Sequence, residues 1–83
     1  MDLMKFKINM LEYISDNFDV DVDDIDDDTP LFSSTLLDSF GLIDLVSYIE
    51  QEAMLKVETL DMHLENFDAI EKIQAFVARK KGL

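Results

Sequence analysis

Three separate stretches of this 83-residue chain space their apolar residues three or four positions apart, as one face of an α-helix requires. The first runs from Leu3 to Phe18, the second opens at Asp38-Ser39, and the third follows Asp68. No stretch is a strong β-strand candidate, and one Pro and two Gly leave few positions that break helices. Residues 1–83 are therefore predicted to form one all-α domain.

The remaining helical segment is expected to be short. Residues 59–66 leave room for only a short helical turn between the second and third stretches. Asp68 and Glu71 are spaced like a capping box that starts the last helix, and Gly82 suits its end. The expected architecture is a four-helix bundle with three longer helices and a short third helix. The apolar positions that define the longer helices are Met4, Ile8, Leu11, Ile14 and Phe18, then Leu42, Leu45, Val46, Ile49 and Ala53, then Ile70, Ile73, Phe76 and Val77.

A long acidic loop separates the first two longer helices. Residues 19–28 read DVDVDDIDDD, and like charges this dense oppose compaction. An EF-hand loop counted from Asp19 needs a Glu at its last position, where Pro30 stands. We therefore expect a solvated loop with weak divalent-ion binding and no specific metal site. Apolar residues along the loop predict that it packs on the core, namely Val20, Val22, Ile25, Leu31, Phe32, Leu36 and Leu37.

The charge of the chain restricts its partners. Nineteen Asp and Glu against seven Lys and Arg give a net charge of −12, while 48% hydrophobic residues are enough for a core. Such a chain repels nucleic acid and suits a basic protein surface. No apolar run is long enough to span a membrane, and the N-terminus lacks a signal-peptide pattern. We expect a monomer located in the cytoplasm.

Catalytic constellations are weak. The chain has no Cys, and its one His, His63, lies in the short third helix, where a surface role is common. Ser39 lies in Leu-Asp-Ser-Phe-Gly, which is not the G-x-S-x-G elbow of serine hydrolases. No catalytic residue is predicted.

The start of the second helix carries the most informative residues. At about 100° per residue, Phe40 lies opposite the stripe that faces the core. An exposed Phe at a helix start has no role in folding and suggests a docking surface. The alternative is that Phe40 folds back onto Leu36 or Leu37 and completes the core. The predicted partner-binding residues are Asp38, Phe40, Ile43, Asp44 and Ser47.

An Asp-Ser pair followed by an apolar residue, at the second helix of an acidic chain of this length, resembles the acyl and peptidyl carrier proteins that bear 4′-phosphopantetheine. The form Leu-Leu-Asp-Ser-Phe-Gly, residues 36–41, looks more like stand-alone aminoacyl carriers, the D-alanyl carriers among them, than the Asp-Ser-Leu-Asp of fatty-acid carriers. The resemblance implies a covalent arm on Ser39 that holds an acyl or aminoacyl cargo as a thioester. Gly41, in place of an acid, is expected to reduce the charge of the partner surface.

The resemblance also implies the partners. They are a phosphopantetheinyl transferase, an acyl- or aminoacyl-activating ligase, and downstream transferases or synthases with basic docking surfaces. A carrier of this kind is not itself an enzyme, because its partners supply the catalysis. The alternative is an unmodified acidic helical adaptor that binds a basic protein, which leaves the position of Ser39 unexplained.

Overall fold

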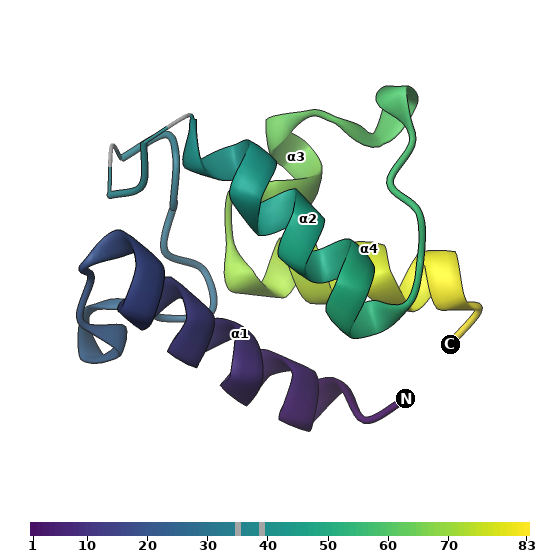
Figure 1. Ribbon diagram of the computed structural model, residues 1–83, viewed down its shortest axis with the longest axis horizontal. Coiled ribbons are helices and arrows are strands. Elements are labelled where there is room, and N and C mark those ends of the chain that lie inside the picture. Colours follow the sequence, from purple (N-terminus) through teal and green to yellow (C-terminus); the bar gives the residue numbers. More distant parts are fainter. Residues whose placement is uncertain (35, 39) are drawn as a thin grey trace.

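The computed structural model describes residues 1–34, 36–38 and 40–83, and within these ranges the chain is all-helical (Figure 1). The long helices are α1 (Leu3–Phe18), α2 (Gly41–Ala53) and α4 (Ile70–Lys81), and α3 (Leu64–Phe67) is a single turn. Two 3₁₀ turns, η1 (Val22–Asp24) and η2 (Thr59–Asp61), lie in the connections. The predicted fold, three longer helices and a short third one, is confirmed.

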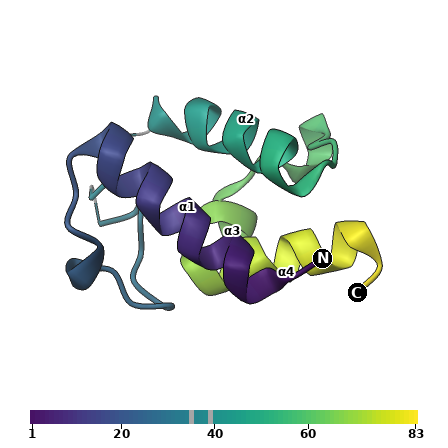
Figure 2. The same cartoon turned by 60° about the horizontal axis from the view of Figure 1, so that its bottom comes forward.

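The chain termini and the start of α2 lie at opposite ends of the molecule. Figures 1 and 2 show α1 and α2 running in opposite directions, with both chain termini at one end. The segment that joins α1 to α2, called the first connection below, and the start of α2 lie at the other end. The start of α2, which follows the predicted attachment residue in the sequence, is therefore remote from the termini.

Helix α1 begins where Asp2 caps it, and its expected apolar stripe is confirmed in part, since Ile14 is buried and Leu11 and Phe18 are partly buried against the core. The Asp2 Oδ1 accepts hydrogen bonds from the backbone N–H groups of residues 4 and 5, at 3.0 and 3.1 Å. Phe6, Met10 and Ile14 are buried, whereas Met4 and Ile8 are 64% and 55% exposed. The helical spacing was correct, but Phe6 and Met10 extend an i, i+4 row that competes with Met4 and Ile8 and faces the core.

Helix α2 begins two residues later than the sequence predicts. The Asp38 backbone carbonyl accepts from Gly41 N at 2.8 Å, and its Oδ1 accepts from Phe40 N at 2.9 Å. Asp38 therefore organises a turn before the helix instead of occupying its N-cap. The predicted core stripe is confirmed for Leu45, Val46, Ile49 and Ala53, and Leu42 is partly buried.

The segment before α4 contains two turns where the sequence predicted one. The capping box lies at Glu58 and Asp61, around η2, and the N-cap of α4 is Ala69, which provides no side-chain cap. The predicted capping box of Asp68 and Glu71 is therefore wrong. Helix α4 otherwise follows the prediction, since its apolar stripe is buried and Gly82 ends it in the left-handed conformation, at φ 74°.

The acidic connection packs on the core as expected. Ile25, Leu31, Phe32 and Leu37 are buried, and Val20, Val22 and Leu36 are partly buried. Its acidic part is also held by polar contacts, because Asp27 pairs with Lys7 on α1 at 2.5 Å and its carbonyl accepts from Glu71 N at 2.9 Å. The connection is thus a fixed part of the fold despite its charge.

Candidate functional site

The loop that leads to α2 is fastened to the junction of α3 and α4 by one buried carboxylate. The Asp68 Oδ1 accepts from Phe32 N at 2.7 Å and from Ser33 N at 3.0 Å, and its Oδ2 accepts from the Ser33 hydroxyl. The Asp68 backbone carbonyl accepts from Leu31 N at 2.7 Å. Three consecutive loop residues are therefore bound to a residue more than thirty positions further along the chain.

These hydrogen bonds decide the ionisation of Asp68. Burial, which leaves Asp68 only 8% exposed, raises the pKa of its carboxyl. Hydrogen bonds from Ser33 and Phe32 to the carboxylate, together with the charge of Lys72, lower the pKa further than burial raises it. The net pKa lies below the usual value, so the carboxylate is ionised at neutral pH and accepts hydrogen bonds from the loop.

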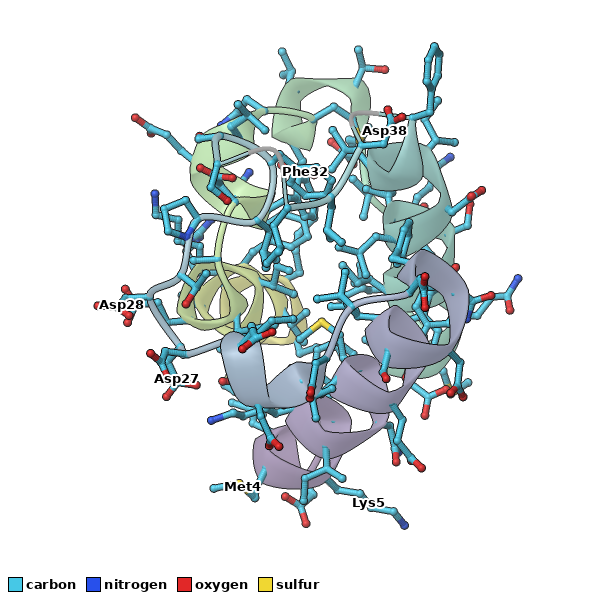
Figure 3. All side chains as sticks on the ribbon, turned by 90° about the vertical axis from the view of Figure 1, so that its left-hand side faces the viewer. Met4, Lys5, Asp27, Asp28, Phe32 and Asp38 are labelled. Atoms are coloured by element: carbon cyan, nitrogen blue, oxygen red, sulfur yellow. The ribbon has the colours of Figure 1, made fainter. Side chains whose placement is uncertain are left out.

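The loop connects directly to the candidate site. Leu37 N donates to the Leu31 carbonyl at 2.7 Å, which closes the segment between them, and Leu37 is buried. Asp38 follows at the surface (Figure 3). The turn that it forms with Phe40 and Gly41 opens α2. Ser39, the predicted attachment residue, lies outside the described residues. Its neighbours on both sides in the sequence are exposed.

The predicted partner-binding residues lie on the outer face of α2. Phe40 and Ile43 are 81% and 63% exposed, and Asp44 and Ser47 are also exposed. The alternative that Phe40 packs against Leu36 or Leu37 to complete the core is therefore wrong. Two large apolar side chains stand in solvent at the start of α2, next to carboxylates, as a docking surface requires.

Gly41 has a packing role that the sequence analysis missed. It is buried, and a Cβ at this position would lie 2.4 Å from the Phe18 ring. Phe18 meets Tyr13 edge to face, and Tyr13 stacks on Tyr48 at 4.2 Å. Burial, with Glu52 and other nearby charges, raises the pKa of Tyr48 to about 12. Gly41 therefore faces the α1–α2 interface, and the expectation that it alters the charge of the partner surface is wrong.

We expect Gly41→Ala to lower the free energy of unfolding by roughly 1–3 kcal/mol, as overpacking of a close contact does. The added methyl must displace the Phe18 ring from its contact with Tyr13. Thermal unfolding followed by circular dichroism measures the change. The double variant with Phe18→Leu should regain part of the loss, and a Gly41→Ala chain as stable as the parent would contradict this packing.

His63 and the acidic residues form no metal-binding group in the described ranges. His63 is exposed ahead of α3, and its Nε2 lies 3.3 Å from the Asn66 amide nitrogen. Among the residues that the structure describes, no three His, Asp or Glu side chains are grouped to hold a metal ion. No helix in these ranges is long and apolar enough to cross a bilayer.

The loop contacts of Asp68 are the feature near the site that sequence reasoning did not find. The place of Asp68 ahead of an apolar helical stripe suggested a local cap, whereas its partners lie in the first connection. A signal was nonetheless present, because Asp68 stands between Phe67 and Ala69-Ile70 in an apolar stretch. A carboxylate in such surroundings is buried only when hydrogen bonds compensate it.

Comparisons with known proteins bear on this site. A family model described as a phosphopantetheine attachment site matches residues 10–77. The chain is also 32% identical over 74 residues to the probable acyl carrier protein PigG of Serratia sp. (strain ATCC 39006), which covers 88% of this chain and 85% of that protein. Neither comparison supports the unmodified adaptor.

The described residues fit the prosthetic group that this family carries. Asp38 and Phe40, on either side of the serine in sequence, are exposed and leave room for a covalent group in solvent. The start of α2 also favours a nearby anion, because its first N–H groups and its dipole are positive there. The chain belongs to the phosphopantetheine-attachment family, and it is a carrier protein with a covalently attached 4′-phosphopantetheine, not an enzyme.

Proposed function

We propose that the arm is attached to Ser39 and that the chain carries an acyl or aminoacyl cargo between partner enzymes. The observation that carries the proposal is the exposed turn of Asp38 and Phe40 at the start of α2, held by a buried loop anchor. When bound, the group supplies a thiol that holds the cargo as a thioester, chemistry that a chain without Cys cannot supply itself.

The chain's own residues present the attachment segment. Asp38 closes the turn through its side chain and its carbonyl, and Gly41 allows α2 to start close to α1. A phosphodiester in this segment lies near the positive end of the α2 dipole, which favours its charge. Ser39 requires no base within this chain, because the transferase supplies the catalysis.

Mapping the modified residue tests the attachment site. The protein is incubated with coenzyme A and a broad-specificity phosphopantetheinyl transferase, digested, and fragmented in a mass spectrometer. We expect the arm only on the peptide that contains Ser39. The hydroxyls of Ser33 and Ser34 already donate to Asp68 and to the Pro30 carbonyl. An arm on Ser15, Ser33, Ser34 or Ser47 would contradict the proposal.

The family membership implies partner enzymes such as transferases and synthases. We propose more specifically a phosphopantetheinyl transferase, an acyl- or aminoacyl-activating ligase, and downstream enzymes with basic docking surfaces. The charge of −12 supports this, because it steers a basic partner toward the carrier and speeds association at low salt. The form of residues 36–41 favours a stand-alone aminoacyl carrier. A monomer in the cytoplasm stays a prediction of the sequence.

Phe40→Ala is expected to raise the KM of the transferase for the carrier by about tenfold or more, because exposed aromatic side chains act as anchors in interfaces. The free energy of unfolding should change by no more than about 0.5 kcal/mol, as for other surface substitutions. Steady-state loading kinetics and thermal unfolding measure the two effects.

Met54→Ala is the matched control for this variant. Met54 is 84% exposed at the opposite end of α2. Its substitution therefore removes a similar apolar surface far from the attachment segment. We expect its KM to equal that of the parent chain. Equal KM values for Phe40→Ala and the parent would refute the role of Phe40 as an anchor.

A further inference from the structure

The contact between Asp68 and residues 31–33 joins two distant parts of the chain a few residues ahead of the attachment segment. We propose that Asp68 is a positioning residue, whose carboxylate at the α3–α4 junction fixes the loop ahead of α2 in the orientation that the transferase recognises. This inference rests on the proposed attachment at Ser39.

The contact is dense and directional. The Asp68 side chain and carbonyl accept from Leu31 N, Phe32 N, Ser33 N and the Ser33 hydroxyl. A buried apolar side chain holds a loop against the core but leaves it some freedom to slide and rotate. Hydrogen bonds to consecutive backbone N–H groups restrict both movements, because they weaken steeply with angle.

A short path of contacts runs from this anchor to the attachment segment. The Leu31 carbonyl, in the same peptide group as the anchored N–H of Phe32, accepts from Leu37 N at 2.7 Å. Leu37 precedes Asp38, whose side chain and carbonyl hold Phe40 N and Gly41 N. A change in the orientation of residues 31–33 is therefore passed to the turn that opens α2.

The choice of residue at position 68 is consistent with this role. Phe67, Ala69 and Ile70 are buried beside Asp68, so an apolar residue there would avoid the cost of burying a charge. A carboxylate offers only acceptors and binds two N–H groups and a hydroxyl together. The arrangement is that of a preorganised site whose supporting side chains fix the functional segment.

The test compares Asp68→Ala with Asn66→Ala. Asn66 is buried two residues earlier, and its side chain donates to the Asp61 carbonyl and accepts from Arg79, both at 2.9 Å. The Asn66→Ala variant therefore loses hydrogen bonds at the same junction, and none of these bonds is made to the loop. Loading by the transferase is measured as kcat and KM at a temperature at which circular dichroism shows each variant folded.

We expect kcat/KM for Asp68→Ala to fall by about tenfold or more, since misplacement of a reacting segment by about 1 Å can cost a hundredfold. Asn66→Ala should load like the parent even if its melting temperature falls equally. Asp68→Asn keeps one acceptor oxygen for the loop and should fold more readily than Asp68→Ala. Its kcat/KM should therefore lie between those of the parent and Asp68→Ala. Backbone amide NMR signals of residues 36–38 and 40–41 should shift in Asp68→Ala and not in Asn66→Ala.

The outcomes separate this inference from the proposed function. Normal loading of the parent at Ser39, with a kcat/KM of Asp68→Ala equal to those of Asn66→Ala and the parent, would overturn the inference alone. If Asp68→Ala does not fold, an equal kcat/KM of Asp68→Asn would overturn it in the same way. Absence of loading in the parent, or loading at another serine, would overturn the proposed function and the inference with it.

Discussion

Ser39→Ala is expected to abolish attachment of the arm while the helical bundle stays folded. The hydroxyl oxygen is the atom that bonds to the phosphate, so its removal leaves the transferase without a nucleophile on this chain. The cost to stability should be at most about 2 kcal/mol, the usual loss when a serine is removed near a helix start. Asp38 limits this cost, because its own side chain bonds to Phe40 N in the turn before α2.

Labelling with a fluorescent coenzyme A analogue and thermal unfolding measure these two effects. Ser15→Ala provides the control, since Ser15 is a partly exposed serine on α1, outside the predicted partner-binding residues, and should leave labelling unchanged. Persistent labelling of the Ser39→Ala chain would refute the attachment site. If Ser39→Ala instead unfolds the chain completely, the loss of labelling is explained by unfolding and not by the missing hydroxyl.

Asp68→Ala is expected to lower the free energy of unfolding by about 3 kcal/mol at pH 7. Hydrogen bonds to a charged acceptor contribute roughly 1.5–3 kcal/mol, and a buried donor left without a partner costs about 1–3 kcal/mol. The substitution removes the acceptor of Phe32 N and Ser33 N. Urea unfolding at pH 7 measures the difference. Asp28→Ala, which removes an exposed carboxylate from the same connection, should change the free energy by no more than about 0.5 kcal/mol.

The contribution of Asp68 should also depend on pH. Its pKa in the folded chain is lower than in the unfolded chain, where Asp titrates near about 3.9. Its stabilising effect is therefore present above that value and is lost as the pH falls through the folded pKa. The charge of Lys72 contributes to this lowered pKa. The stability difference between the parent and Asp68→Ala should shrink as the pH falls below about 4, and a constant difference would contradict this ionisation.

The helices could be predicted because their residues carry local signals. Apolar spacing determines where α1 and α4 lie, and Asp2 and Gly82 mark a start and an end. The spacing could not decide which face of α1 is buried, since two apolar rows were available. The row of Phe6, Met10 and Ile14 faces the core because α2 and α4 pack against it, and that information is not local.

The candidate site likewise has features that the local sequence predicts and features that depend on distant contacts. The exposed position of Phe40 follows from helical geometry and was predicted. The contacts of Asp68 and Gly41 join segments more than twenty residues apart, so no local pattern specifies them. A sequence motif can therefore indicate where the arm is attached, but the anchor behind that segment becomes visible only in the folded chain.

The intact mass of the parent chain after incubation with coenzyme A and a broad-specificity phosphopantetheinyl transferase tests the central claim most directly. The claim is that this chain is a carrier with one arm on one serine. The predicted result is complete conversion to a species heavier by one phosphopantetheine, with no second addition. A mass that stays unchanged under conditions in which a known carrier is fully converted would contradict the claim.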